Sequence, residues 1–513
     1  MPPTSTEWPW SSRACATSAI ELRPQGSRAA AGLACSLAIL FLLLSAVQAS
    51  TIDAGSNIQA AIDSASAGDI ILVSAGDYGS FLVDRPVTIM GEGEPCLYAG
   101  LQRPAIEVKS DGVAISGFRI KGVGKDTTAK FNYYMQNPAA AAGASLDDPN
   151  SAIVVKGGGF ALNDTTIYGA QVGISAESIR GVLLQNVTLE GCDTGASILQ
   201  SHSITVSGCR ISGCKKYGLD VESSSGVRAD NNSVINNSNA GMLLKESSGG
   251  VIQDNILSQN TFGLSLWNSS ENEVRRNQAE HNRYGILVTD WSSHNNITDN
   301  VVRDNSRSEI VAGFGIGISV QENSSYNMLL RNSASGNFNG LEISRGCHHN
   351  AVYNNNASDN KHGIRLNENR NNLIFGNNFN RNDINAYENT SLNIWNTTMG
   401  NYYSDYQGSD GDGDGFGDDP YPLPGPQSVS MDMRPLISPF GTGNLDIEAL
   451  RSEVAKYAVF APAVEEQPTA TMQNGVAVIS RKTPTRAPRW DDSDSFDASA
   501  PPFQKENSFL NGD

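Results

Sequence analysis

One repeating pattern constrains the fold of this chain more than any other feature of its sequence. Between residues 186 and 382 the same motif returns every 22 or 23 residues. The motif is an apolar pair, a polar position, a second apolar pair, a second polar position, and then a glycine followed by an apolar-x-apolar triplet. A fixed period of this length is typical of a solenoid, in which each repeat forms one coil.

Three columns of residues set the expected register of the coils. The glycine column contains Gly173, Gly195, Gly218, Gly241, Gly263, Gly285, Gly317, Gly340 and Gly363. The first polar column contains Asn186, Cys209, Asn232, Asn255, Asn277, Asn300, Asn332, Asn355 and Asn377. The second polar column contains Cys192, Cys214, Asn237, Asn260, Asn282, Asn305, Asn337, Asn360 and Asn382. The one large break in the period predicts an inserted loop around residues 306–315.

The residues within each repeat predict strands and not helices. Apolar residues alternate in runs too short for a helix, as in Gly340-Leu341-Glu342-Ile343. Parallel strands stacked about 4.8 Å apart would bury a continuous apolar core. Asparagine tolerates the left-handed turn conformation and can bond the amide stacked on it. A leucine-rich repeat would need a dense leucine framework, which is missing. We therefore expect an all-β, right-handed, single-stranded parallel β-helix of the pectin-lyase-like type.

The remaining segments are expected to cap, interrupt or follow this solenoid. Residues 57–66 read as a short amphipathic cap helix and residues 70–73 as a buried strand. The expected organisation is cap and first coils over 50–124, an inserted loop over 125–150, β-helix repeats over 151–399, a closing segment over 400–440, and a tail over 441–513. In that tail we expect a helix at 446–460, followed by disorder because the rest lacks apolar periodicity.

The amino-terminal segment and the net charge indicate where in or outside the cell the protein is located. Residues 1–49 read as a signal peptide, with an apolar run over 29–47 and small residues before Ser50, or as an uncleaved membrane anchor. The net charge of −18 leaves no basic stripe for nucleic acid. It fits an extracellular surface that attracts cations. Ten Asn-x-Ser/Thr sequons add weak support for a secreted or cell-surface glycoprotein.

Two cysteines occupy one column in neighbouring coils. Cys192 and Cys214 could form a disulfide across the coils, or could be small buried residues that replace asparagine. The sequence contains no Cys-x-x-Cys pair, so we expect neither a zinc site nor a thioredoxin-like site.

An Asp/Gly-rich stretch in the closing segment predicts a structural calcium site. Its carboxylates alternate with glycines, and with one main-chain carbonyl they could converge on a hard cation. The expected ligands are Asp410, Asp412, Asp414, the Phe416 carbonyl and Asp418. Tyr421 stands where an EF-hand has glutamate, so the loop resembles the shorter dockerin-like calcium loops. The alternative is a solvated acidic turn.

Three stretches together resemble one family. They are Asn57-Ile58-Gln59-Ala60-Ala61-Ile62-Asp63, the asparagine-bearing coils, and Gly400-Asn401-Tyr402-Tyr403-Ser404-Asp405-Tyr406 with the Asp/Gly loop and Pro420-Tyr421. This pattern, over roughly residues 51–440, resembles the NosD-type β-helix proteins, also described as carbohydrate-binding and sugar-hydrolase domains and abundant on the surface of methanogenic archaea. The resemblance implies a right-handed solenoid and export. It does not fix a reaction, although some members are linked to copper delivery.

Two outward columns are expected on the strand after each glycine. Asp220 and Glu222 stand two residues apart on one strand, about 7 Å between Cα atoms. Glycoside cleavage uses a carboxylate pair at such a separation, so this pair is the candidate catalytic site. The alternative is a solvated strand face that carries two incidental carboxylates.

Aromatic and charged residues on the same columns suggest a ligand-binding face. Exposed tryptophans usually mark a contact surface, and these could stack on sugar rings. The candidate binding residues are Trp267, Asp290, Trp291, Lys245, Glu342 and Arg365.

We do not expect a copper site. The best candidate ligands are Cys347, His348, His349 and His362, and successive residues on one turn rarely converge on one ion. The preferred hypothesis is an exported β-helix that binds polysaccharide or a surface glycan. The alternatives are a polysaccharide lyase or glycoside hydrolase, a structural envelope or adhesion protein, and, least favoured, a copper-handling protein.

Overall fold

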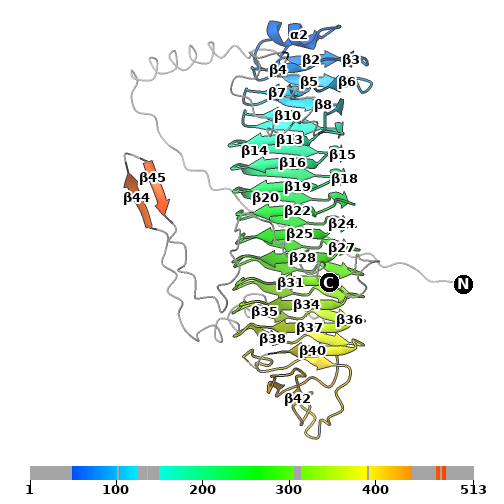
Figure 1. Ribbon diagram of the computed structural model, residues 1–513, viewed down its shortest axis with the longest axis vertical. Coiled ribbons are helices and arrows are strands. Elements are labelled where there is room, and N and C mark those ends of the chain that lie inside the picture. The colour runs from blue at the N-terminus through cyan, green and yellow to red at the C-terminus, as the bar shows by residue number, and fades with distance from the viewer. Residues whose placement is uncertain are drawn as a thin grey trace, which may run out of the picture. The chain divides into compact units, whose positions relative to one another are not determined.

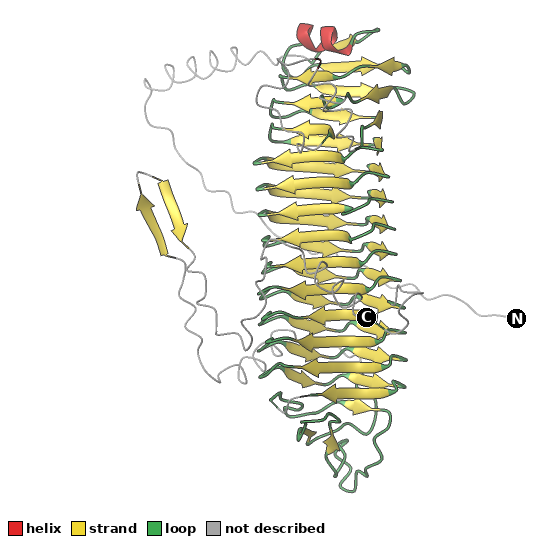
Figure 2. Ribbon diagram, viewed as in Figure 1, coloured by secondary structure: helices red, strands yellow, loops and turns green. Residues whose placement is uncertain are grey.

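The computed structural model describes residues 49–100, 103–124, 136, 150–305, 314–389 and 392–441, and the backbone of two strands at 469–473 and 476–480. The chain divides into two units, at residues 1–444 and 445–513, and each is described by itself. The first unit is a solenoid whose strands stack as parallel rungs (Figures 1 and 2). The expected right-handed parallel β-helix is confirmed.

Each coil contributes one strand to each of three parallel sheets. The first sheet contains β1 (Thr51–Asp53), β2 (Ile70–Val73), β5 (Thr88–Gly91), β8 (Ala114–Ser116), β11 (Phe160–Asn163), β14 (Arg180–Gln185), β17 (His202–Ser207), β20 (Ser225–Asp230), β23 (Val251–Gln253), β26 (Glu273–Arg275), β29 (Asn296–Thr298), β32 (Met328–Leu330), β35 (Ala351–Tyr353) and β38 (Leu373–Phe375). The second sheet contains β4 (Phe81–Val83), β7 (Ile106–Val108), β10 (Ser151–Val155), β13 (Val172–Glu177), β16 (Thr194–Leu199), β19 (Leu219–Glu222), β22 (Ala240–Lys245), β25 (Phe262–Trp267), β28 (Tyr284–Thr289), β31 (Ile316–Val320), β34 (Asn339–Ser344), β37 (His362–Asn367) and β40 (Ile384–Glu388). The third sheet contains β3 (Asp77–Tyr78), β6 (Cys96–Tyr98), β9 (Arg119–Lys121), β12 (Thr166–Tyr168), β15 (Thr188–Glu190), β18 (Arg210–Ser212), β21 (Ser233–Ile235), β24 (Ile256–Ser258), β27 (Gln278–Glu280), β30 (Val301–Arg303), β33 (Ser333–Ser335), β36 (Asn356–Ser358), β39 (Asn378–Asn380) and β41 (Tyr402–Tyr403).

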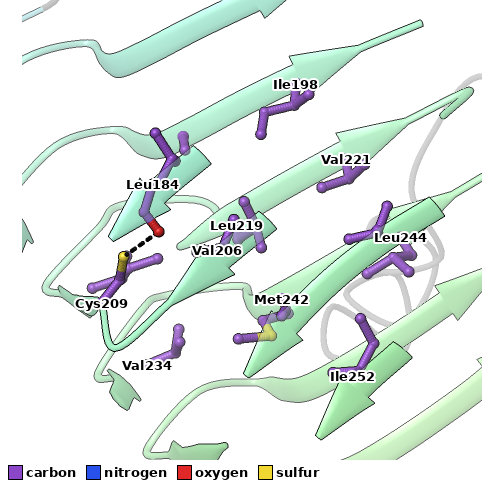
Figure 3. Packing of buried hydrophobic residues seen from close by; sticks show 14 of the residues in the cluster. Leu184, Ile198, Val206, Cys209, Leu219, Val221, Val234, Met242, Leu244 and Ile252 are labelled. Atoms are coloured by element: carbon purple, nitrogen blue, oxygen red, sulfur yellow. Dashed lines mark hydrogen bonds between the residues drawn. The ribbon is translucent and has the colours of Figure 1, made fainter. Parts of the chain in front are cut away.

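The core is a single apolar column enclosed by the three sheets. Alternate residues of every strand point inward, and the same apolar residue types recur at the same place in successive coils. In the coils drawn in Figure 3, Ile198 and Val221 come from the second sheet, and Val206 comes from the first. All three are fully buried.

Both polar columns form continuous amide ladders, as predicted, with one correction. Each ladder asparagine donates its backbone N–H and its Nδ2–H to the Oδ1 of the next asparagine, as Asn277 does to Asn300 at 3.0 Å for both bonds. Asn186 does not belong to the first ladder. It is exposed on a turn at φ 53°, and the register places Val187 in the ladder position.

A third ladder, which the sequence analysis missed, runs along the turns between the second and first sheets. It contains Asn272, Asn295, Asn327, Asn350, Asn372 and Asn393. A column of serines runs beside it, in which each backbone N–H bonds the next hydroxyl, as Ser247 does to Ser269 at 3.0 Å. The ladders thus give the stacked side-chain amides of the turns their hydrogen-bond partners.

Each ladder begins at a backbone N–H group and ends at a carboxylate. The first ladder ends where the Asn401 backbone N–H donates to Asp432 Oδ2 at 2.7 Å. The third ends where Asn393 Nδ2 donates to Glu388 Oε1, also at 2.7 Å. The second passes through Asn385 to Asp405. Because every amide in a ladder donates toward the carboxyl-terminal end, an acceptor-only carboxylate is the group that can complete it.

The glycine column is required by close approach of the backbone. A Cβ atom at Gly285 would lie 2.6 Å from the Gly317 carbonyl oxygen and 3.0 Å from Asn305 Nδ2. Any larger residue would therefore push neighbouring coils apart and break the second ladder.

The two ends of the solenoid are covered differently. The helix α2 (Ile58–Ser64) lies on the first coils, as predicted, and the Asn57 side chain accepts a hydrogen bond from the Ala60 backbone N–H. At the other end β42 (Tyr421–Pro422) and β43 (Met431–Asp432) pair antiparallel. The rings of Tyr403 and Tyr421 stack there at 3.7 Å.

Of the two alternatives for Cys192 and Cys214, a disulfide or two small buried residues, the structure has the second. Both residues are buried free thiols, and the Cys214 backbone N–H donates to Asn237 Oδ1 at the start of the second ladder. Cys192 and Cys214 lie on equivalent turns of adjacent coils, after β15 and β18, and side chains at equivalent positions of stacked coils point the same way. Their Cβ atoms are therefore about one strand spacing apart, which is longer than the usual Cβ separation in a disulfide.

In the second unit the structure describes the backbone of two strands. β44 (Thr469–Gln473) and β45 (Val476–Ser480) pair antiparallel. The sequence between them is Asn474-Gly475, the strongest short-range signal for a two-residue hairpin, and it was overlooked. The predicted helix at 446–460, residues 125–135 and 137–149 of the predicted loop, residues 306–313 of the predicted insertion and residues 1–48 of the predicted leader lie outside the described residues. Within the described part of the chain, no helix has the length and hydropathy needed to cross a bilayer.

Candidate functional site

The candidate site is the outward face of the second sheet, which carries three columns of side chains. They stand one residue before, two residues after and four residues after each glycine of the glycine column. The column before the glycine contains Thr194, Tyr217, Ala240, Phe262, Tyr284, Ile316, Asn339 and His362. The column two after it contains Ser197, Asp220, Leu243, Ser265, Leu287, Ser319, Glu342 and Arg365. The column four after it contains Leu199, Glu222, Lys245, Trp267, Thr289, Gln321, Ser344 and Asn367.

The sequence predicted the second and third of these columns but not the first. The residue before each glycine shares the face because the chain bends at the glycine, which itself points toward the core. Asn339, for example, donates from Nδ2 to Glu342 Oε2 at 2.5 Å. The middle of the face is more enclosed than an open strand surface, since Ser265, Leu287 and Ser319 are buried.

An acid–base cluster lies on β19 and β22. Asp220 and Glu222, the predicted catalytic pair, share the face, and Glu222 Oε1 pairs with Lys245 Nζ at 2.8 Å. Burial, together with the Glu222 carboxylate, raises the pKa of Asp220 to about 6. Burial and the Asp220 charge also raise the pKa of Tyr217, which the sequence analysis had not singled out. The arrangement supplies one carboxyl that keeps its proton up to about pH 6 beside one that is ion-paired.

Two coils further on, the predicted tryptophans flank the face. Trp267 is half-buried at the end of β25, and its indole Nε1–H donates to Asp290 Oδ2. Trp291 is 51% exposed on the turn that follows β28. On the opposite edge the rings of Phe262 and Tyr284 lie 5.4 Å apart. Aromatic side chains therefore border the face on both sides at these coils.

A second polar cluster occupies β34 and β37. Glu342 is buried, and burial raises its pKa despite the nearby Arg365 guanidinium. Asn339 Oδ1 lies 2.9 Å from His362 Nδ1. Glu342 and Arg365 are two of the binding residues predicted from the sequence, whereas the positions of Asn339 and His362 beside them were not predicted.

The residues considered for copper are not brought together. Cys347 points into the core, and His362 lies on the outward face of the second sheet. His348 and His349 lie on the turn before the first sheet, with Nδ1 atoms 2.8 Å apart, and the His349 ring stacks on Tyr326 at 5.2 Å.

The predicted calcium loop brings three of its five expected ligands together. Asp410, Asp412 and Asp414 can place carboxylate oxygens within 4.8 Å of one another, and no other such group of ligands occurs among the described residues. Asp418 instead accepts hydrogen bonds from the Gly411 backbone N–H and the Ser409 hydroxyl.

A cation of the protein also reaches this loop. Arg434 pairs with Asp414 Oδ2 at 3.1 Å and lies over the Phe416 ring. Three clustered carboxylates are hard oxygen ligands, which suit calcium better than copper.

Two family models match the solenoid. One, described as a right-handed β-helix region, matches residues 151–302, and another, described as a periplasmic copper-binding protein (NosD), matches residues 306–408. The chain contains a right-handed β-helix with a NosD-type region. The resemblance in the coils and in the closing stretch from Gly400 to Tyr406 is thus confirmed, and the NosD match ends just before the Asp/Gly loop.

Solved structures with a similar fold are distant in sequence, and no curated protein matches the chain. The Dettilon tailspike protein is 12% identical at a TM-score of 0.45, covering 63% of this chain and 63% of the tailspike. The match thus spans less than two thirds of the tailspike's own length. PfbA, a surface adhesin of Streptococcus pneumoniae, is 13% identical at a TM-score of 0.42, covering 62% of this chain and 87% of PfbA.

Proposed function

We propose that this chain is an exported protein that binds polysaccharide or a cell-surface glycan along the outward face of its second sheet. The leader expected over residues 1–49 accounts for export. A sugar chain lying along the solenoid axis would meet a row of outward side chains, in the same three positions, at every coil, about 4.8 Å apart. A repeating ligand is therefore the natural partner of a repeating face.

The observation that carries the proposal is the aromatic border around Trp267 and Trp291. The Trp291 indole is 51% exposed and follows the strand next to that of Trp267, and neighbouring exposed aromatic residues are typical of contact surfaces. The hydrogen bond to Asp290 fixes the ring of Trp267 in the partly open position where β25 ends. Fixed, partly exposed aromatic rings beside polar groups suit sugars, which present apolar C–H faces and hydroxyl groups together.

A glycan-binding screen of the purified chain tests the proposal. Wild type is compared with Trp267→Ala and Trp291→Ala, with Trp291→Phe to retain a ring, and with Tyr98→Ala as a control aromatic on the third sheet. We expect the two alanine variants to lose most binding and the other two to keep it. Binding that survives both alanine variants would refute this location. Failure to bind any glycan would favour the structural or adhesion alternative.

A second candidate function is glycoside or polysaccharide cleavage by Asp220 and Glu222. The specific observation in its favour is the pKa of Asp220, raised by burial to about 6, since a general acid must hold its proton near the working pH. Products of glycans that bind are analysed with wild type and with Asp220→Asn. Cleavage that disappears in the variant while binding persists would establish catalysis. Equal turnover in both proteins would exclude Asp220 from that role.

A further inference from the structure

Four polar side chains form a connected group on two neighbouring coils of this face. Asn339 and Glu342 lie on β34, and the strand register places them directly beside His362 and Arg365 of β37. Asn339 and His362 therefore belong to the column before the glycine, and Glu342 and Arg365 belong to the column two residues after it. The four side chains thus occupy two columns on two neighbouring coils. None of the four has a role in the candidate catalytic cluster, which lies at β19 and β22.

The hydrogen bonds within this group fix the orientation of the Asn339 amide. Its nitrogen donates to Glu342 Oε2 at 2.5 Å, because a carboxylate oxygen accepts this bond. The amide oxygen must then face His362, whose Nδ1 lies 2.9 Å away. An amide oxygen only accepts, so His362 must carry its proton on Nδ1.

This arrangement leaves His362 Nε2 as the acceptor of the ring. Within the described residues Nε2 makes no hydrogen bond, and it is not closed off from solvent. Burial, with the charges of Arg365 and Lys361, lowers the pKa of His362, so the ring is neutral at pH 7. The Phe338 and Tyr387 rings pack edge-on against it at 5.5 and 5.8 Å.

The Arg365 guanidinium has unused hydrogen-bond donors. Its Nη1 atom lies 3.6 Å from Glu342 Oε2, too far for a hydrogen bond, and among the described residues it makes none. The guanidinium lies 5.7 Å from the centre of the Tyr387 ring, which supports its plane, and its side chain is 33% exposed. A supported guanidinium with free donors suits a planar carboxylate.

We propose that this group is a subsite for a carboxylate-bearing sugar, in which Arg365 binds the carboxylate and His362 Nε2 accepts a hydrogen bond from a neighbouring hydroxyl. Asn339 and Glu342 are positioning residues that hold the His362 tautomer. The inference rests on the proposed glycan binding and deepens it, because it names the acidic class of sugar that this end of the face would select.

The tautomer can be tested without any ligand. Nitrogen NMR of the full chain labelled with ¹⁵N-histidine distinguishes the two neutral tautomers, and loss of the signal in His362→Gln assigns it. We expect the Nδ1–H form in wild type and a mixture in Asn339→Leu, which removes the acceptor. The Nε2–H form in wild type would overturn the proposal that Asn339 and Glu342 hold the His362 tautomer.

Selectivity is tested with one sugar scaffold in two charge states. An oligogalacturonate and its methyl ester are titrated against wild type, Arg365→Gln and Arg381→Gln. Arg381 is a matched control, because it is exposed and pairs with Asp359 outside this face. We expect Arg365→Gln to weaken binding of the acid about tenfold, to change binding of the ester less than about twofold, and Arg381→Gln to change neither.

The outcomes separate this inference from the broader proposal. Equal affinity of wild type for acid and ester, or an Arg365→Gln variant that still prefers the acid, overturns the carboxylate subsite while leaving glycan binding in place. No binding of either oligosaccharide, in a chain that also fails the glycan screen, overturns the proposed function itself.

Discussion

Replacing one ladder asparagine should destabilise the solenoid far more than replacing an exposed asparagine. Asn300 is fully buried in the first ladder. Its Oδ1 accepts two bonds from Asn277 at 3.0 Å, and its Nδ2 donates to the Val274 carbonyl at 2.9 Å and to Asn332 Oδ1 at 3.0 Å. In Asn300→Ala, two Asn277 donors and the Val274 carbonyl lose their partners.

The size of the effect follows from these lost bonds. A buried polar group without a partner costs about 1–3 kcal/mol, so three such groups predict a loss of about 3–5 kcal/mol once some water entry is allowed. Asn300→Asp should cost at least as much, because it places a carboxylate oxygen against the Val274 carbonyl and Asn332 Oδ1. Asn356→Ala, at an exposed strand position, should change the free energy of unfolding by less than about 0.5 kcal/mol.

Urea unfolding followed by circular dichroism measures the difference in the free energy of unfolding. Hydrogen exchange of the coils around Asn300 checks that the loss is local, since long repeat arrays need not unfold in two states. If Asn300→Ala were no less stable than Asn356→Ala, within about 1 kcal/mol, the ladders would not hold the coils together.

Three further predictions concern the closing segment and pH. Calcium should raise the melting temperature, and Asp412→Asn should abolish the rise; an unchanged melting temperature in wild type would remove the calcium proposal. Asp432→Ala should lower the free energy of unfolding by about 3 kcal/mol, because the Asn401 and Tyr403 donors lose a buried acceptor. A variant as stable as wild type would contradict the conclusion that the Asp432 carboxylate completes the first ladder. Burial raises the pKa of Asp220 from 3.8 to about 6, so the free energy of unfolding should fall by up to about 3 kcal/mol as pH rises from about 4 to 6. Asp220→Asn should remove that part of the pH dependence, and an identical pH profile would contradict the shift.

The sign of the pH effect follows from proton binding. A carboxyl with a higher pKa in the folded state binds more protons when folded, between its unfolded and folded pKa values. Its contribution to stability is therefore present below about pH 4 and is lost as pH rises through 6. Asp432, whose pKa burial also raises to about 6, adds to the effect in the same direction.

The period of the sequence was enough to predict the solenoid, because each coil repeats the same apolar and polar spacing. The outward columns two and four residues after each glycine could be predicted for the same reason. Register within a turn could not be predicted as safely: Asn186 suits both a ladder and a left-handed turn, and it takes the turn at φ 53°. The third ladder has the same period and could have been found by aligning the turns.

Other features depend on contacts that spacing alone does not reveal. Asp432 ends the first ladder from 31 residues beyond Asn401, across the closing segment. The His362–Asn339 contact requires the residue before each glycine to face outward, which follows from the bend at glycine and not from simple strand alternation. The shared column position of Cys192 and Cys214 was predicted correctly. Their side chains point the same way, however, and they do not form a disulfide.

The central claim is that the outward face of the second sheet holds the ligand. Hydrogen exchange measured by mass spectrometry, with and without a saturating glycan selected in the screen, tests it most directly. The account predicts added protection in peptides spanning β19 to β37 of the second sheet and little change in strands of the first and third sheets. Protection confined to the other two sheets, at saturation, would contradict it.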